Sequence, residues 1–472
     1  MHYTNFMRIQ ISDLNKKIGC EVEIFGWVNT RRDMGNISFI DLRDITANIQ
    51  VVLISKEMDE QSAEAIKKLR PEYVLKVVGE IKKRQEKQIN IKVFNGEIEI
   101  VAKKVEILNE SKTLPFDIST DGYEIKEEVR MKYRYLDLRR SRAKKNLILR
   151  HKLIKFIRDF MDEKGFMEIE TPLFTKTTPE GARDYIVPSR LHPGKFYALP
   201  QSPQQYKELL MIAGMEKYFQ IARAIRDEDP RADRQPEHTQ WDFEMSFVER
   251  DDVMNILEEG IIKLTKYLEP MTEKKLLVEP LPRLTYRETM AKYGTDKPDI
   301  RSGPKDPNVL AFAWIIDFPL VEWKKEENRW DPVHHMFVMP KPGYKNLLDT
   351  DPGKIISTQF DLVCNGYEIC SGSIRINQRQ LQEKIMGLIG LNLEKARQQF
   401  GHLLEALEFG APPHGGAAPG IDRLAMLYAG ESNIREVIAF SKTGDGRDLM
   451  MDAPSEVDEK QLKELNIKIA RE

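Results

Sequence analysis

The chain of 472 residues is longer than one hydrophobic core usually serves, so we expect two or three domains. Apolar side chains make up 41% of the chain and charged ones 31%, a composition that excludes a disordered protein. The 73 basic and 75 acidic residues leave a net charge of -2, which argues neither for nor against binding of nucleic acid; any attraction for phosphate must be local.

Cysteine usage and hydropathy indicate the compartment. Cys20, Cys364 and Cys370 have neither the number of a disulfide framework nor the spacing of a zinc site, which is typical of a reducing environment. No apolar run approaches the ~18 residues of a membrane span, and the first residues lack the layout of a signal peptide. We expect a cytoplasmic protein with no membrane partner.

Residues 1–110 are predicted to form a small β-barrel. Apolar and polar residues alternate in EVEIFGWVNTRRDMGNISFIDLRD, YVLKVVGEIKK and GEIEIVAKKVEIL, and a helical stretch, EMDEQSAEAIKKLR, lies between them. Several short strands with one helix favour a closed barrel of the oligonucleotide-binding (OB) type. Another small β-sandwich would alternate in the same way, and the pattern leaves it open.

Residues 111–145 are predicted to be a basic hinge or linker. The segment from Asn109 to Glu127 is rich in turn residues, and between Arg130 and Lys145 eight basic residues face one acid, Asp137. Such a stretch either grips phosphates or forms a solvated connecting helix, and charge alone favours neither.

Residues 146–472 are predicted to form an α+β domain. Leu149, Leu153 and Ile157 share one face of a helix that ends at Gly165, and FMEIETPLF follows as a strand. Strands and helices then mix without regular βαβ alternation, which favours an antiparallel sheet flanked by helices.

The segment LPQSPQQYKELLM is predicted to start a helix with Ser202 as N-cap, Pro203 in the first turn and a capping box to Gln205. Tyr206, Leu209, Leu210 and Ala213 are the expected buried stripe, and Gln204, Lys207 and Glu208 the polar face. A lysine and an amide near a helix N-terminus suit a carboxylate ligand, although an ordinary surface lysine fits the same pattern.

The segment KYFQIARAIRDEDPRADRQPEHTQWDFEMSFVER reads as a strand, a charged loop and a second strand. In the second strand, Thr239, Trp241, Phe243, Met245 and Phe247 point to the core, and His238, Gln240, Asp242 and Glu244 point the other way. The face with His238, Gln240, Asp242 and Glu244 is here called the polar floor. Burying its two carboxylates costs free energy unless the floor lines a ligand site. Arg226 and Glu228 enter the loop beside this floor; a one-sided solvated sheet would alternate too.

Two further segments predict a nucleotide site. In QFDLVCNGYEICSGSIRINQR, Asn365-Gly366 is a hairpin signal that predicts pairing of Val363 with Glu368. Asp361 then lies on the same face of the hairpin as Glu368. The two carboxylates would repel each other, and Mg²⁺ carried by a nucleotide would relieve that repulsion. An exposed acidic hairpin is the alternative. In PPHGGAAPGIDRLAMLYAG, glycines precede a helix with Arg423 in its first turn, which favours a phosphate seat.

These motifs together resemble the class II aminoacyl-tRNA synthetases. IETPLF is similar to the end of the first class motif, IARAIRDED with EHTQWDFEMSF to the second, and GIDRLAML to the third. TPEGARDYIVPSR, ALPQSPQQYK, RADRQPEHTQ and NGYEICSGSIRI resemble the bacterial-type aspartyl-tRNA synthetases in particular. The resemblance covers nearly the whole chain, including GWVNTRRDMG in the barrel, and implies ATP-dependent attachment of L-aspartate to tRNA(Asp) through an aspartyl-adenylate, by a homodimer that uses ATP and Mg²⁺.

The resemblance also implies roles for single residues. Arg226, Glu228 and Arg423 would be catalytic, with Arg226 on the α-phosphate and Arg423 on the γ-phosphate. ATP would contact these and Asp227, Gln235, His238, Glu368, Gly420, Ile421 and Asp422. Aspartate would be held by Glu180, Ser202, Gln204, Lys207, Arg226, Asp242, His334 and Arg375. Within that set, Lys207 and Arg375 would clamp the side-chain carboxylate, and Glu180 and His334 would lie on mobile lids. Asp361 and Glu368 would hold Mg²⁺, and the anticodon would meet Arg32, Phe39, Gln50 and Glu99.

Three departures from the family pattern stand out. The sizeable domain that bacterial members insert between the second and third motifs is reduced to about residues 295–310, so its tRNA contacts are expected to be lost while activity survives. His238 stands where phenylalanine is usual, which predicts a weaker stack on adenine that is sensitive to pH near neutrality. Thr30 stands where a basic residue is common.

Four other functions were weighed against this one. A relative acting on asparagine or lysine is disfavoured because Lys207 and Arg375 suit a dicarboxylate. A non-discriminating enzyme that also aspartylates tRNA(Asn) stays open as the alternative. The resemblance places the choice between one tRNA and both at Met34 and Lys87, and by analogy it favours tRNA(Asp) alone. Intact site arginines disfavour a non-catalytic paralogue, and the barrel disfavours a tRNA-free asparagine synthetase.

Overall fold

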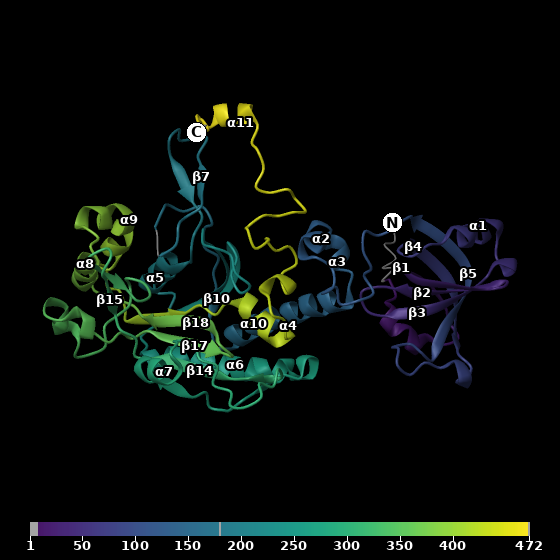
Figure 1. Cartoon of the computed structure of the whole chain (residues 1–472), viewed down its shortest axis with the longest axis horizontal. Helices are drawn as coiled ribbons and strands as arrows, with labels where there is room; N and C mark the ends of the chain where they lie inside the picture. The colour runs from purple at the N-terminus through teal and green to yellow at the C-terminus, as the bar shows by residue number, and fades with distance from the viewer. Residues whose placement is uncertain (1–7, 179–180, 471–472) are drawn as a thin grey trace. The chain divides into compact units, whose positions relative to one another are not determined.

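A computed structural model describes residues 8–178 and 181–470 of the chain. It comprises two compact units, Met1–Asp117 and Ile118–Glu472, whose boundary falls inside the segment 111–145 that the sequence predicts as a linker (Figure 1). None of the helices in the described residues is long and apolar enough to cross a membrane.

The N-terminal unit is a closed β-barrel, as the alternating segments predict. Its strands are hydrogen-bonded in the order β1-β2-β3-β5-β4. Val28, Ile40, Val51, Leu75 and Ile100 are buried inside it, so the alternation encloses one apolar core. The elements are η1 (Ile11–Lys17), β1 (Glu21–Met34), β2 (Ile37–Arg43), β3 (Asn48–Ile54), η2 (Ser55–Glu57), α1 (Glu60–Lys68), β4 (Val74–Lys83), η3 (Glu86–Gln88) and β5 (Ile98–Asn109).

The larger unit is built on a sheet in the order β12-β14-β17-β18-β19-β10-β9-β6. The pairs from β14 to β9 are antiparallel, which confirms the expected arrangement for the centre of the sheet. The short edge strands β12 and β6 run parallel to their neighbours. The strands are β6 (Met167–Glu168), β9 (Lys217–Ile225), β10 (Glu237–Ser246), β12 (Arg283–Thr285), β14 (Phe312–Ile316), β17 (Phe360–Cys364), β18 (Tyr367–Ile374) and β19 (His414–Ala417).

One face of this sheet packs on α4 (Ser141–Glu163), α6 (Arg250–Thr272) and α10 (Ile421–Ala429), and Figure 1 shows α6 along the sheet. Trp241 and Phe243 of β10 are fully buried in this core. The next residues of the strand therefore face away from the core. That alternation places the polar side chains of β10 on the opposite face.

The remaining elements surround the sheet. They are α2 (Glu127–Lys132), α3 (Arg134–Asp137), β7 (Ile186–Pro188), β8 (Phe196–Ala198), α5 (Gln204–Ile212), β11 (Lys275–Leu276), α7 (Tyr286–Tyr293), β13 (Val309–Leu310), β15 (Val321–Lys324), β16 (Arg329–Pro332), η4 (Lys345–Asp349), η5 (Pro352–Lys354), α8 (Arg379–Leu388), α9 (Leu393–Ala406), η6 (Ile434–Glu436) and α11 (Glu459–Glu464).

The strand expected over FMEIETPLF is much shorter in the structure. Only Met167 and Glu168 pair with β9, and the Ile169 N–H still donates to the Phe219 carbonyl at 3.1 Å. Pro172, which has no N–H, cannot extend the ladder. The prediction was therefore right in place and wrong in length.

The expected polarity of α5 is reversed. Gln204, Lys207 and Glu208 are buried, whereas Leu209 is half-buried and Ala213 is exposed. The polar face is covered because it lies against the polar side of β10, where its groups find partners. The predicted capping box is absent too: the helix begins at Gln204, whose N–H donates to the Ser202 hydroxyl at 3.1 Å.

Four arginines of the basic stretch between Arg130 and Lys145 are held by acidic side chains. Arg130 and Arg142 each approach the Glu436 carboxylate at 2.8 Å, and Arg134 and Arg140 each approach Asp137 at 2.7 Å. Burial raises the pKa of Glu436, but Arg130 and Arg142 outweigh it and bring that pKa to about 2. The sequence could not reveal this because Glu436 lies far along the chain.

Candidate active site

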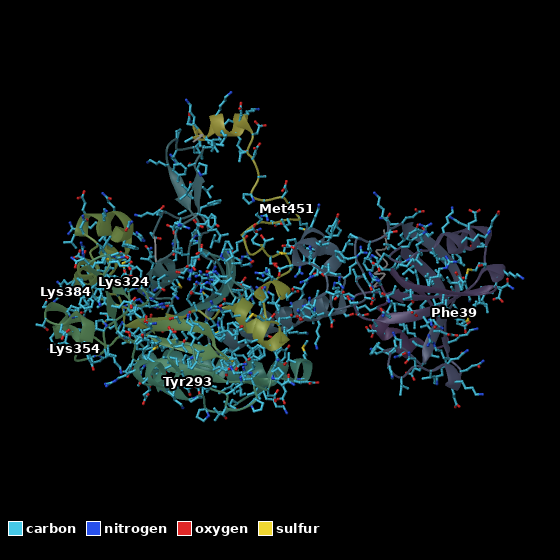
Figure 2. All side chains as sticks on the ribbon, viewed as in Figure 1. Phe39, Tyr293, Lys324, Lys354, Lys384 and Met451 are labelled. Carbon is cyan, nitrogen blue, oxygen red and sulfur yellow. The ribbon has the colours of Figure 1, made fainter. Side chains whose placement is uncertain are left out.

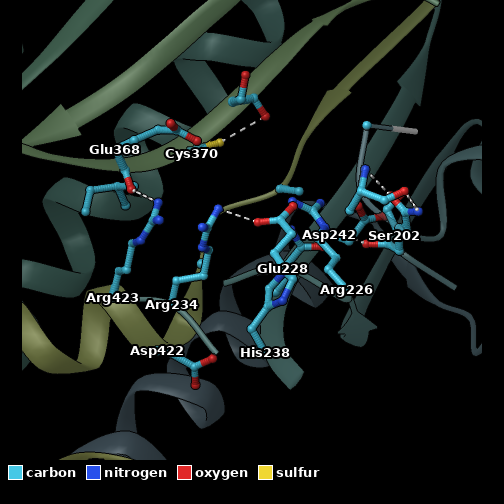
Figure 3. Close-up of a pocket in the computed structure, with 18 of the residues that line it drawn as sticks. Ser202, Arg226, Glu228, Arg234, His238, Asp242, Glu368, Cys370, Asp422 and Arg423 are labelled. Carbon is cyan, nitrogen blue, oxygen red and sulfur yellow. Dashed lines mark hydrogen bonds and ion pairs between the residues drawn. The ribbon is translucent and has the colours of Figure 1, made fainter. Parts of the chain in front are cut away.

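A cavity of about 440 Å³ lies on the polar face of β10. Its walls come from β10, α5, the loop between β9 and β10, β18 and the start of α10 (Figure 3). The predicted residues that line it are Ser202, Gln204, Lys207, Arg226, Glu228, Gln235, His238, Asp242, His334, Glu368, Arg375, Gly420, Asp422 and Arg423. The hairpin segment that carries Glu368 and the glycine-rich segment that carries Arg423 thus meet the polar floor of β10 in one cavity.

Two cations and two carboxylates meet at one end of the cavity. Lys207 Nζ lies 2.9 Å from Asp242 Oδ2 and 3.2 Å from Glu244 Oε2. Arg375 holds the same Glu244 carboxylate through Nε at 2.9 Å and Nη2 at 3.2 Å. All four side chains are buried, so each charge depends on its partners. Lys207 and Arg375, far apart in the chain, therefore meet on Glu244.

A close approach of two strands makes this arrangement possible. Gly416 of β19 pairs with Glu244 of β10, and a Cβ on Gly416 would lie 2.2 Å from Glu244 Oε2. Only glycine leaves that carboxylate in place. Gly415 and Gly416 therefore belong to strand β19 and allow its close approach to β10. Of the glycines predicted to form a phosphate site, Gly420 is the one that directly precedes α10.

Every N–H of the Arg375 guanidinium already has an acceptor. Nε and Nη2 donate to Glu244, Nη1 donates to Ser373 Oγ at 2.8 Å and lies 2.9 Å from His335 Nε2, and Nη2 also donates to the Gly416 carbonyl at 3.2 Å. A guanidinium has five N–H groups. A ligand carboxylate can therefore bind Arg375 only by replacing one acceptor, whereas Lys207 keeps one N–H beyond its two acidic partners.

Two oxygen acceptors face the cavity beside this charge cluster. Asp242 Oδ1 is buried and has no hydrogen-bond partner among the described residues. Gln204 Nε2 donates to Glu208 Oε1 at 2.6 Å, which leaves the amide oxygen of Gln204 for the cavity. Glu208 itself is 3.4 Å from His414 Nε2. Burial raises the pKa of Asp242 although Lys207 lowers it, and an ammonium ligand would supply the missing partner.

Arginines line the other end of the cavity. Arg226 donates through Nε to the Gln201 carbonyl at 3.2 Å, and its Nη atoms have no hydrogen-bond partner among the described residues. Arg423 donates to the Glu368 carbonyl at 2.6 Å and contacts Asp233 at 3.2 Å. Figure 3 shows Arg423 beside Arg234, with Arg226 nearer to Asp242. This end suits an extended anion such as a triphosphate.

His238 of β10 lies between these two groups of charges. Burial lowers its pKa, and Arg226 and Arg423 lower it further, to about 3. The imidazole is therefore neutral at physiological pH. The pH sensitivity near neutrality expected for this position is therefore wrong, because neither the burial of the ring nor the charges of Arg226 and Arg423 could be inferred from neighbouring residues in the sequence.

The hairpin of β17 and β18 carries the predicted carboxylate pair. Its turn residues Asn365 and Gly366 have φ of 52° and 90°, and Val363 pairs with Glu368 as the sequence predicts. A bulge beyond that pair sets Asp361 opposite Ser371, whose hydroxyl donates to it at 2.6 Å. Burial and the charge of Glu368 raise the pKa of Asp361 to about 8.

This pair fits a magnesium ion that arrives with phosphates. The two carboxylates repel each other, as the raised pKa of Asp361 indicates, and a cation between them would relieve that. The described residues contain no group of three or more His, Cys, Asp or Glu side chains that could hold a metal. Mg²⁺ usually takes only one or two carboxylates and completes its shell with water and substrate phosphates.

A few predicted residues do not line the cavity. Asp227 pairs with Arg183 at 3.2 Å, Ile421 belongs to the apolar core, and Asp361 lies behind Ser371. Glu180 lies outside the described residues. Asp422 does line the cavity, but its two oxygens are already engaged by other side-chain and backbone donors.

The predicted anticodon residues adjoin one another on the barrel. Arg32 of β1 is the register partner of Phe39 of β2 and donates to Gln50 Oε1 at 3.2 Å. Gln50 of β3 donates to Glu99 of β5 at 2.9 Å. Phe39 is half-buried, and Figure 2 labels it on this unit. The four side chains thus form one surface of amide, charged and aromatic groups.

His335 and Lys297 line the cavity and Glu244 lies beneath it, and the sequence predicted no partner or role for these three residues. Glu244 was placed on the polar floor without a partner, whereas the structure makes it the link between two cations. His335 contacts Arg375, and Lys297 lies 2.7 Å from Glu368 Oε2. The alternation of β10 was a signal for Glu244. Nothing local signalled Lys297, which comes from an irregular segment.

Two family patterns match the chain. Residues 126–444 match the family described as tRNA synthetases class II (D, K and N), and residues 22–108 match the OB-fold nucleic acid binding domain. Among solved structures, an asparaginyl-tRNA synthetase from Pyrococcus horikoshii with asparaginyl-adenylate has a TM-score of 0.75 at 21% identity, covering 93% of this chain and 98% of that one. An aspartyl tRNA synthetase from Entamoeba histolytica has a TM-score of 0.72 at 20% identity, covering 93% and 92%. At these identities the likeness shows the fold.

Curated relatives are similar over nearly the whole chain. An aspartate--tRNA(Asp/Asn) ligase of Dehalococcoides mccartyi (strain CBDB1) is 41% identical over 593 residues, covering 97% of this chain and 98% of the relative. An aspartate--tRNA ligase of Geobacillus kaustophilus (strain HTA426) is 40% identical over 579 residues, covering 96% and 97%. Because both alignments are longer than the 472 residues of this chain, both relatives contain residues with no counterpart here.

Proposed function

The chain belongs to the class II tRNA synthetases for aspartate, lysine and asparagine, and we infer that within this family it is an aspartate--tRNA ligase. It joins L-aspartate to tRNA in two steps, through an aspartyl-adenylate. The single observation that carries the choice of amino acid is the meeting of Lys207 and Arg375 on Glu244. Both cations carry only donors, and a carboxylate, which has only acceptors, is the side chain that can take the remaining N–H of Lys207 and replace one acceptor of Arg375.

Charge alone does not select aspartate here. Asp242 and Glu244 already balance Lys207 and Arg375, so the cavity is not strongly positive. Selection instead comes from hydrogen-bond direction. The amide of asparagine would turn an N–H toward these donors, and a lysine substrate would bring a third cation against them. The substrate ammonium would lie at Asp242 Oδ1 and the amide oxygen of Gln204.

Positioning of aspartate and ATP, together with neutralisation of phosphate charge, accounts for catalysis of the first step. The α-carboxylate of aspartate attacks the α-phosphorus of ATP, the bond to the β-phosphate oxygen breaks, and pyrophosphate leaves. Arg226, with its Nη atoms turned to the cavity, would hold both reacting groups, and Arg423 would hold the γ-phosphate. His238, neutral between the arginines, would stack on adenine. Mg²⁺ held by Asp361 and Glu368 would supply neutralisation of the phosphate charge.

The second step transfers the aspartyl group. A terminal tRNA hydroxyl attacks the aspartyl carbonyl, and AMP leaves with the electron pair of the broken acyl–phosphate bond. In the barrel, Arg32, Phe39, Gln50 and Glu99 would read the anticodon by stacking and base-edge hydrogen bonds. The contacts that the larger relatives make through their additional residues would be absent, and activity would not depend on them.

We expect a homodimer in the cytoplasm, and exposed apolar side chains on the larger unit support the dimer. Leu173, Phe174 and Ile186 are exposed to 48%, 59% and 57%, and they lie near the segment that resembles the dimer-forming motif. An apolar surface of this kind favours association with a second copy. Size-exclusion chromatography with light scattering would give twice the chain mass, and a monomer at micromolar concentration would contradict the assignment.

The tRNA partner is tRNA(Asp), with tRNA(Asn) as the alternative. The alternative has a specific basis, because the 41% identical relative from Dehalococcoides mccartyi is named for both tRNAs. Charging of purified tRNA(Asp) and tRNA(Asn) transcripts with labelled aspartate, side by side, separates the two. We expect tRNA(Asp) to be charged. Charging of neither tRNA by an enzyme that binds both would contradict the function.

A further inference from the structure

Lys297 lines the phosphate end of the cavity but takes no part in either of the two proposed reaction steps. It lies in the irregular segment between α7 and β13, which is the shortened insertion region. Its Nζ is 2.7 Å from Glu368 Oε2. Among the described residues this ammonium is the only side chain that contacts the Glu368 carboxylate, because Arg423 bonds the main-chain carbonyl of Glu368 instead.

The ammonium occupies a position that a divalent cation would need. Glu368 and Asp361 are the carboxylates that fit Mg²⁺, and Lys297 supplies a positive charge beside Glu368. An ammonium and a divalent cation on the same carboxylate repel each other, so a metal ion at Glu368 weakens the hold of Lys297 on it. A metal–nucleotide complex therefore favours release of Lys297 from Glu368.

Lys297 is able to make that move. Its side chain is 40% exposed, and Glu368 takes one of its three N–H groups. The triphosphate would lie between Arg226 and Arg423, within the same cavity wall as Lys297. A phosphate oxygen is a stronger partner for an ammonium than water is, so the lysine would exchange one anion for another.

We propose that Lys297 holds Glu368 in the nucleotide-free enzyme in place of the divalent cation and transfers to the β- or γ-phosphate of ATP when the metal–nucleotide complex binds. This inference rests on the proposed function, since it takes ATP as the nucleotide. Lys297 is thus a nucleotide-binding residue that the shortened segment contributes. It also prevents the carboxylate pair from collecting a metal ion before the nucleotide arrives.

The test is metal binding without nucleotide. Mn²⁺ titration followed by electron paramagnetic resonance measures binding to the full-length enzyme, with Lys297→Met compared to the wild type. We expect Mn²⁺ to bind the variant roughly tenfold more tightly, because its competitor is gone. Lys297→Arg, which keeps the charge, should bind Mn²⁺ as weakly as the wild type. Unchanged Mn²⁺ affinity in a folded Lys297→Met enzyme would overturn the proposal.

The second measurement is nucleotide affinity by calorimetry, with a non-hydrolysable ATP analogue and saturating Mg²⁺. Lys297→Met should bind it roughly tenfold more weakly, since a phosphate contact is lost. Unchanged affinity would show that Lys297 only ties down its segment. Lys305→Met is the matched control: Lys305 lies in the same segment, pairs with Asp299 at 2.9 Å and is 61% exposed. It should change neither affinity.

These outcomes are separable from those of the proposed function. Aspartate-dependent exchange of pyrophosphate into ATP by the wild-type enzyme tests the function itself. An enzyme without that exchange would refute the function, whatever the Mn²⁺ result. An enzyme with exchange, but with Mn²⁺ affinity unaffected by Lys297→Met, would refute only the role of Lys297.

Discussion

Replacing Arg375 with alanine perturbs the amino-acid end of the cavity while the phosphate end keeps its residues. Arg375 gives Glu244 two of its three charged contacts, at 2.9 Å and 3.2 Å, and Lys207 gives the third. The variant removes the guanidinium that would hold the aspartate carboxylate. It also leaves Glu244, which is fully buried, with Lys207 alone.

The contacts set the size of the effect. Truncating one partner of a buried, hydrogen-bonded charge pair between protein and ligand costs about 2–5 kcal/mol of binding, and Lys207 would still hold the aspartate carboxylate, so we take about 3 kcal/mol. At about 1.4 kcal/mol per factor of ten, kcat/KM for aspartate falls by at least about 100-fold. KM for ATP should stay within about threefold, because Arg226 and Arg423 make no contact with Arg375.

The assay is aspartate-dependent exchange of pyrophosphate into ATP, with thermal unfolding to establish that the variant is folded. Arg375→Lys, which keeps a cation on Glu244, should retain more stability than Arg375→Ala. Arg379→Ala is the control, since Arg379 pairs with Glu383 at 3.0 Å near the surface and should leave exchange unchanged. Undiminished exchange by Arg375→Ala would refute the reasoning.

Three further predictions concern other parts of the chain. Deleting residues 1–110 should leave pyrophosphate exchange and abolish charging of tRNA, and full charging by the truncated enzyme would show that the barrel does not bind tRNA. Glu436→Gln should lower the unfolding free energy at pH 7 by about 3 kcal/mol, since Arg130 and Arg142 hold the pKa near 2. Because this stability is present above the ordinary pKa of glutamate and is lost as pH falls toward 2, the difference from wild type in denaturant unfolding should shrink below about pH 4; a constant difference would contradict the pairing. His238→Phe and wild type should show the same dependence of ATP KM on pH between 6 and 8, because His238 is neutral there; divergence would mean that the ring titrates.

The parts of the fold that follow from local pattern were predictable. Alternation around Gly26 and Gly35 predicted the first barrel strands, and Asn365-Gly366 predicted the hairpin turn and the pairing of Val363 with Glu368. In each case the signal lies within a few residues of the feature. Turn geometry and side-chain alternation are fixed by local sterics.

Contacts between distant segments were not predictable in the same way. The polar face of α5 was expected to be exposed, yet Lys207 is buried because β10 offers it partners, and Glu208 is buried with Gln204 and His414 as its partners. Glu244 was visible as part of a polar floor, but its two cations come from α5 and from the residue that follows β18. The role of the arginines between Arg130 and Lys145 stayed open in the sequence because one of their acids, Glu436, lies some 300 residues away along the chain. A local sequence pattern carries no information about contacts between residues that are far apart in the chain.

The most direct test of the account is a crystal structure with a non-hydrolysable analogue of aspartyl-adenylate. The account predicts that the side-chain carboxylate of the analogue lies at hydrogen-bond distance from both Lys207 Nζ and the Arg375 guanidinium, with the ammonium at Asp242. A carboxylate bound elsewhere, with Lys207 and Arg375 still paired only to Asp242 and Glu244, would contradict it.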